Sequence, residues 1–112
     1  MVEKKQRLCR FEEIPEDGCK GFSIQYQGRD LELFILKRKD KLYAYKNNCP
    51  HTGASLNWKP DVFMDFDDLY IQCAIHGARF EVETGFCVWG PCAKQFLIKV
   101  KFEIIDNDIY IL

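Results

Sequence analysis

The chain has 112 residues, of which 47% are hydrophobic and 29% are charged, and its formal net charge at pH 7 is -1. This length fits a single domain, and this composition excludes an intrinsically disordered chain. A near-neutral charge argues against nucleic-acid and membrane partners, because nucleic acids and anionic lipids are held mainly by basic surfaces. No stretch approaches the roughly 18 apolar residues of a membrane helix, and residues 1–10 lack the apolar core of a secretory signal. A cytoplasmic protein is therefore expected.

The first half of the chain predicts β-strands, because its hydrophobic residues recur at every second position. In chain order these strands are expected at 22–26, 31–36 and 41–45, with polar turns at 27–30 and 37–40. The second of these turns contains Lys37, Arg38 and Lys39, which are expected to be solvated. No aromatic residues are interleaved with them, as a nucleic-acid platform would require.

The second half continues in the same period. Short strands are expected at 69–71, 79–82 and 86–89, the last two joined by a turn at 83–85. The clearest alternation runs over 96–105 and places these residues on one face: Phe96, Ile98, Val100, Phe102 and Ile104. A polar turn at 106–108 and a strand at 109–112 follow, and no segment has a helical period. The predicted fold class is all-β, a small antiparallel sandwich or barrel.

Two short motifs fall in breaks between the expected strands. Residues 49–53 read C-P-H-T-G and residues 73–77 read C-A-I-H-G, so each of the two histidines stands beside a cysteine. Cysteines in a reducing compartment favour metal binding over disulfides. Four ligands of this kind suit tetrahedral zinc or an iron–sulfur centre. The four candidate ligands are Cys49, His51, Cys73 and His76.

The order of the ligands bears on the choice of metal. Zinc modules with two cysteines and two histidines usually group like with like, whereas here each loop supplies one of each. A Rieske [2Fe-2S] cluster uses two cysteines on one iron and two histidines on the other, so each loop would span the cluster. Gly53 and Gly77 would let the backbone approach such a site.

The sequence resembles the Rieske-type ferredoxins. The resemblance rests on C-P-H-T-G-A-S-L at 49–56, C-A-I-H-G-A-R-F-E-V-E-T-G at 73–85 and W-G-P at 89–91, and it extends over nearly the whole chain. It implies one Rieske-type [2Fe-2S] cluster per chain. Cys49 and Cys73 would hold one iron, and His51 and His76 would hold the other.

The same resemblance implies the organisation of the chain. It predicts a single Rieske [2Fe-2S] domain over residues 1–112, with a two-loop cluster-binding subdomain at about 47–91. Gly90 and Pro91 would form a third loop that covers the cluster.

The sequence departs from the high-potential relatives at four positions. Those relatives carry an extra, bridged cysteine in each loop where this chain has Ala54 and Ile75, so that disulfide cannot form. They carry Ser and Tyr hydroxyls near the cluster where this chain has Ala78 and Phe80, whose side chains cannot donate hydrogen bonds. Fewer donors stabilise the reduced cluster less, so a potential near the bottom of the Rieske range of about -150 to +300 mV is predicted.

The predicted function is one-electron transfer from a reductase to an oxygenase or another acceptor enzyme. A catalytic iron site would need further histidines, and both are used as cluster ligands, so the chain is expected to be a carrier and not an enzyme. No G-x-G-x-x-G nucleotide motif occurs, and no small-molecule substrate is expected. Two alternatives are an accessory subunit or domain of a larger oxidoreductase, of the nitrite reductase type, and a structural zinc module serving interaction alone.

Several residues remain outside the motif. Cys9 and Cys87 are expected to be small buried hydrophobic residues, and Cys92 could lie near the cluster, while Cys19 has no predicted role. Trp58 and Trp89 are expected to pack in the core or to shield the site. The acidic segment 61–68 is either a solvated loop or a docking patch for a basic partner.

Overall fold

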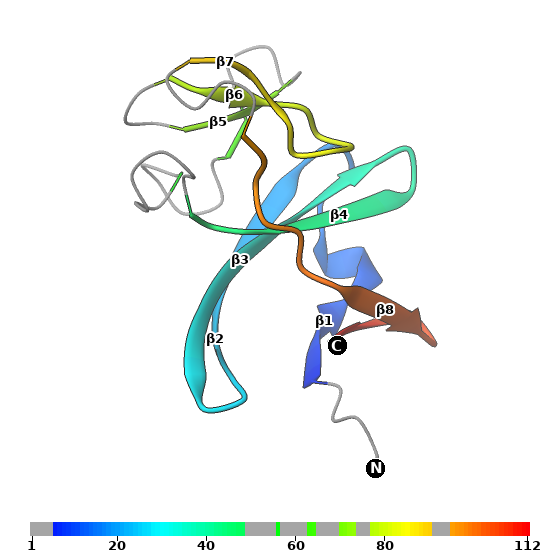
Figure 1. Ribbon diagram of the computed structural model, residues 1–112. Helices are drawn as coiled ribbons and strands as arrows, with labels where there is room; N and C mark the ends of the chain where they lie inside the picture. The colour runs from blue at the N-terminus through cyan, green and yellow to red at the C-terminus, as the bar shows by residue number, and fades with distance from the viewer. Residues whose placement is uncertain (1–5, 49–55, 57–62, 65–69, 74–76, 91–94) are drawn as a thin grey trace.

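The computed structural model describes residues 6–48, 56, 63–64, 70–73, 77–90 and 95–112 (Figure 1). Its secondary structure over these residues is β apart from one 3-10 turn, η1 (Phe11–Glu13). The strands are β1 (Gln6–Arg10), β2 (Cys19–Tyr26), β3 (Arg29–Arg38), β4 (Lys41–Lys46), β5 (Ile71–Gln72), β6 (Arg79–Phe80), β7 (Cys87–Trp89), β8 (Phe102–Ile105) and β9 (Asp108–Ile111).

Two-residue turns join the strands of three hairpins. In each turn both residues have positive φ, as type I′ hairpin turns require: Gln27–Gly28, Lys39–Asp40 and Asp106–Asn107. The polar turns expected near these positions are therefore confirmed. The strands that flank the first two turns reach further than the sequence predicted, because β2 and β3 pair without a break from Cys19↔Leu36 to Tyr26↔Arg29.

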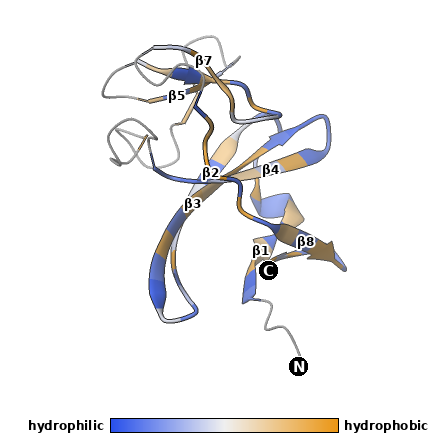
Figure 2. Ribbon diagram, viewed as in Figure 1, coloured by the Kyte–Doolittle hydropathy of each residue, from blue (hydrophilic) through white to orange (hydrophobic). Residues whose placement is uncertain are grey.

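The strands form three antiparallel sheets of three strands each, with the orders β1-β9-β8, β2-β3-β4 and β5-β6-β7. In Figure 1 the sheet that contains β3 and β4 runs through the middle of the molecule, with β5, β6 and β7 at one end and β1 and β8 at the other. Figure 2 shows hydrophilic residues at the free end of the β2–β3 hairpin, where it projects from the rest of the molecule.

The middle sheet separates two hydrophobic cores. From Leu33 to Lys37 every residue of β3 is buried, and successive side chains enter opposite cores. The site-side core contains Cys19, Phe34, Leu36, Tyr45, Leu56, Phe63, Ile71, Cys73, Ala78, Phe80, Val82, Cys87 and Leu97. The distal core contains Cys9, Ile14, Leu33, Ile35, Leu42, Ala44, Val100, Ile109 and Ile111. The cores therefore lie on the two faces of β3 and β4.

The expectation of one strand over 96–105 is wrong. Only β8 is a strand there, and Phe96 and Lys99 form isolated bridges to Phe86 and Tyr45. The predicted apolar face also fails, since Phe96 is 56% exposed while Leu97 is buried. The cause is that the pairing partner changes along the segment, from the β7 region to β4 and then to β9. Alternate residues of the segment therefore do not all point toward the same core.

Lys37 corrects the expectation of a solvated basic turn. Its side chain is buried, its Nζ donates a hydrogen bond to the carbonyl of Phe11 at 2.9 Å, and the ammonium lies 3.9 Å from the centroid of the Phe11 ring. Both contacts reach η1, so Lys37 fastens this 3-10 turn to β3.

Candidate metal centre

The second predicted loop begins at the end of β5. The backbone N–H of Cys73 donates to the carbonyl of Ala78, and the N–H of Gly77 donates to the carbonyl of Cys73, each at 2.8 Å. These bonds hold together the two ends of the 73–78 segment. Gly77 has a φ of +70°, a conformation that glycine adopts at the least cost, so the backbone favours the glycine of the motif.

Cys73 is the one predicted ligand among the described residues. It is 0% exposed and belongs to the site-side core, beside Ala78 and Phe80. Cys49, His51 and His76 lie outside the described residues, as do Gly53, Ala54, Ile75 and Pro91. The structure thus places the thiol of Cys73 in an apolar environment at the start of its loop.

Gly90 packs directly against this loop. Its φ is +108°, and a Cβ added to it would lie 2.7 Å from the Cα of Ala78 and 3.0 Å from the Cβ of Ala78. Only a glycine fits this backbone-to-backbone contact, so the chain after β7 is pressed against the second loop. A cysteine thiol at the start of this loop suits an iron–sulfur cluster, which is held by cysteine thiolates.

Ala78 and Phe80 are fully buried. Neither carries a side-chain hydrogen-bond donor. The structure places both side chains in the site-side core, and the small number of donors to a cluster remains a prediction.

β7 forms the outer strand of the small sheet next to the loop. The thiol of Cys87 donates to the carbonyl of Trp89 at 3.3 Å, and Cys87 is buried as predicted. Trp89 is 61% exposed, so of the two roles predicted for it, packing in the core and shielding the site, the first is wrong. Its ring lies over the loop, because a Cβ on Gly77 would be 3.6 Å from Trp89 Cζ3. The guanidinium of Arg79 lies 5.7 Å from the ring centroid.

Tyr45 connects the small sheet to the middle sheet. Its hydroxyl donates to the carbonyl of Val82 at 2.6 Å, in the turn between β6 and β7. Its ring fills the space beside Gly85, where an added Cβ would lie 2.8 Å from Tyr45 Cε1. Burial raises the pKa of Tyr45 well above its ordinary value. The tyrosine therefore stays protonated and able to donate at neutral pH.

A second contact between the sheets is aromatic. The rings of Phe34 on β3 and Phe63 stack with centroids 4.2 Å apart. The carbonyl of Phe63 accepts a hydrogen bond from the N–H of Gln72 on β5 at 2.9 Å. The contacts of Tyr45 and Phe63 were not predicted, because no motif marks these residues. The resemblance placed Gly90 in a third loop, and the structure adds its close packing against Ala78.

Within the described part of the chain, no helix is long and apolar enough to cross a membrane.

Comparison with known proteins gives a consistent result. The family model of the Rieske [2Fe-2S] domain matches residues 4–105. The chain is 28% identical over 112 residues to the ferredoxin component of a naphthalene 1,2-dioxygenase system from Pseudomonas aeruginosa, covering 97% of this chain and 99% of that protein.

Two solved structures share the fold. One is the ferredoxin of carbazole 1,9a-dioxygenase from Nocardioides aromaticivorans IC177, with a TM-score of 0.72, 21% identity and 97% of each chain covered. The other is a chain from a complex of reduced oxygenase and oxidized ferredoxin in carbazole 1,9a-dioxygenase, with a TM-score of 0.71, 22% identity, and 96% of this chain and 91% of that chain covered. The predicted all-β antiparallel fold class is confirmed.

Proposed function

Because the chain belongs to the Rieske [2Fe-2S] domain family and carries a Rieske-type [2Fe-2S] cluster, we propose that Cys49, His51, Cys73 and His76 hold that cluster. Cys49 and Cys73 supply thiolates to one iron, and His51 and His76 supply imidazole nitrogens to the other. The burial of Cys73 at the start of its loop supports this assignment. The cluster, when bound, accepts and releases one electron.

The predicted family, cofactor and electron-transfer function are confirmed by the domain match and by relatives named as ferredoxin components. We propose that this chain is a carrier and not an enzyme, that it works as one domain over residues 1–112, and that about 47–91 forms the cluster-binding part. We propose a cytoplasmic location, a compartment in which unbridged thiols such as those of Cys9 and Cys87 are usual.

The acceptor that we propose is an oxygenase component that acts on an aromatic compound. The observation that carries this proposal is the end-to-end match to a naphthalene dioxygenase ferredoxin, which leaves no large part of either chain unmatched. A relative of similar coverage is named as the ferredoxin subunit of a 3-phenylpropionate/cinnamic acid dioxygenase, at 27% identity. The donor would be the matching reductase.

Exposed residues on β7 offer a contact surface for the partner protein next to the second loop. Trp89 and the adjacent Val88 are exposed on β7 beside the second loop, and the guanidinium of Arg79, on the paired strand β6, lies 5.7 Å from the centroid of the indole ring. An exposed aromatic residue supported by an arginine is typical of an interface anchor. These residues would exclude water when a partner covers the loop.

Metal analysis and the visible spectrum of the purified protein test the cofactor ligands. Cys73→Ser is expected to abolish the reddish colour and the bound iron. Cys87→Ser serves as the matched control, because Cys87 is equally buried on the neighbouring strand and a hydroxyl can still donate to the Trp89 carbonyl. Wild-type protein that is colourless and loaded with zinc, or Cys73→Ser that keeps its iron, would contradict the assignment.

A further inference from the structure

The first predicted loop leaves β4 through an ordered turn centred on Asn47. The N–H of Asn48 donates to the carbonyl of Lys46 at 2.9 Å, a bond between residues i and i+2. Since the φ of Asn47 is not positive, this is the inverse γ-turn that commonly begins a loop after a strand. The backbone N–H of Asn47 donates to the carbonyl of Glu32 on β3, also at 2.9 Å. The backbone is thus fixed on the scaffold two residues before Cys49.

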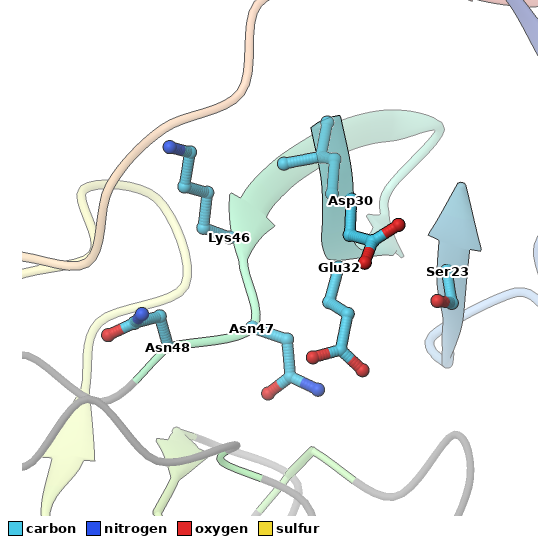
Figure 3. Close-up of a pocket in the computed structure, with 7 residues that line it drawn as sticks. Ser23, Asp30, Glu32, Lys46, Asn47 and Asn48 are labelled. Atoms are coloured by element: carbon cyan, nitrogen blue, oxygen red, sulfur yellow. The ribbon is translucent and has the colours of Figure 1, made fainter. Parts of the chain in front are cut away.

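The side chain of Asn47 reaches the other end of the same loop. Its Oδ1 accepts a hydrogen bond from the backbone N–H of Leu56 at 2.7 Å. Leu56 is 0% exposed and its side chain is packed in the site-side core. Figure 3 shows the Asn47 side chain extending away from the end of β4, beside that of Glu32. One residue therefore joins the β3–β4 scaffold to both ends of the 48–55 segment.

This arrangement needs the asparagine side chain. A buried backbone N–H that lacks a partner is costly, and Oδ1 is the acceptor for the N–H of Leu56. Asn48, which adjoins Cys49 directly, has an exposed side chain and contributes only its backbone to the bonds described here. The two neighbouring asparagines thus differ in role although they have the same chemistry.

We propose that Asn47 is a positioning residue that closes the base of the first cluster loop and thereby fixes the placement of Cys49 and His51. The inference rests on the proposed ligand set. It assigns to a single hydrogen bond, Asn47 Oδ1 to Leu56 N–H, the task of holding the two ends of an eight-residue segment at a constant separation. Loss of that bond would let the ligands depart from the geometry that retains iron.

Hydrogen exchange and iron release of the cluster-loaded protein test this proposal together. In Asn47→Leu, which has no acceptor, the Leu56 amide is expected to exchange about tenfold faster and a chelator to remove iron about tenfold faster than in the wild type. Asn47→Asp keeps an acceptor oxygen and is expected to restore both rates to within about threefold. Asn48→Leu, the matched control, is expected to change neither.

Exchange of the β2–β3 amides in the same experiment shows whether each variant is folded. If Asn47→Leu does not fold, Asn47→Ser provides a milder truncation whose hydroxyl is too short to replace Oδ1. Wild-type iron release in a folded variant whose Leu56 amide has lost protection would overturn the proposal, as would failure of Asn47→Asp to restore slow release. A wild-type protein without an iron–sulfur spectrum would instead refute the proposed function.

Discussion

The two ends of this molecule are built in different ways. The distal end, like the middle sheet, relies on longer ladders: β1 pairs with β9 at the distal end and β2 with β3 in the middle sheet, over most of each strand. The small sheet at the site has strands of two or three residues and depends on single contacts with the middle sheet, among them the Tyr45 hydroxyl and the Phe34–Phe63 stack. A scaffold of ladders tolerates local change, whereas a site held by single contacts should be sensitive to each one.

The largest expected effect comes from comparing two glycines that both have a positive φ, +108° for Gly90 and +78° for Gly28. Gly90→Ala would place a Cβ 2.7 Å from the backbone of Ala78, and Gly28→Ala would place one in open space. We expect Gly90→Ala to lower the free energy of unfolding by about 3 kcal/mol or more and to reduce the bound iron, because backbone strain and a clash add together. Gly28→Ala should cost about 1 kcal/mol. Urea denaturation of both variants measures the difference, and equal losses would contradict it.

The distal core provides a test by pH. Burial raises the pKa of the Cys9 thiol to about 11 from an ordinary value of 9.0. Because the folded-state pKa lies above the unfolded one, the protonated thiol favours folding fully below pH 9, and this stabilisation is lost as the pH rises from 9 to 11. The loss should be on the order of 2 kcal/mol. Cys9→Ala should flatten the fall in urea midpoint over this interval; parallel curves for the two proteins would refute the explanation.

A buried and an exposed tyrosine hydroxyl can be compared directly. Tyr45→Phe removes the donor to the Val82 carbonyl and leaves that buried oxygen without this bond, which should cost about 1.5 kcal/mol. Tyr26→Phe removes an exposed bond to the carbonyl of Leu112 and should cost less than about 0.5 kcal/mol. Thermal unfolding followed by circular dichroism measures both. A greater loss of stability in Tyr26→Phe than in Tyr45→Phe would show that the Tyr45–Val82 hydrogen bond does not hold the small sheet to the middle sheet.

Exposed hydrophobic residues at the two ends of the molecule should contribute differently to binding of the oxygenase acceptor. Trp89→Ala should raise the KM for the oxygenase acceptor about tenfold in a reconstituted electron-transfer assay, because an anchoring aromatic is lost beside the second loop. Ile104→Ala, on β8 at the distal end, should leave this KM unchanged. The assignment of the docking side fails if the two variants behave alike or in the opposite order.

The difference between long ladders and single contacts also explains which parts of the structure could be predicted from the sequence. Strands near 22–26, 31–36 and 41–45 were predictable because alternate residues of each strand point to the same side of the sheet along the whole ladder. The alternation at 96–105 was misleading, since the chain there changes its neighbouring strands, which a two-residue period cannot reveal.

At the site, the motifs predicted the family and the cluster, because ligand chemistry dictates residue types at fixed spacing. The supporting contacts could not be predicted. Tyr45 and Val82 are 37 positions apart in sequence, and the contact between Gly90 and Ala78 depends on how two loops pack. Trp89 was predicted either to pack in the core or to shield the site, and its residue type could not decide between the two; its place on the outer strand of a small sheet leaves it exposed.

The midpoint potential tests the central claim most directly, namely that the protein is a Rieske electron carrier whose second loop offers few donors to the cluster. Protein-film voltammetry should show a single one-electron wave in the lower part of the range of about -150 to +300 mV, because the side chains of Ala78 and Phe80 carry no hydrogen-bond donor. A wave at a clearly high positive potential, or no wave from intact protein, would contradict the account.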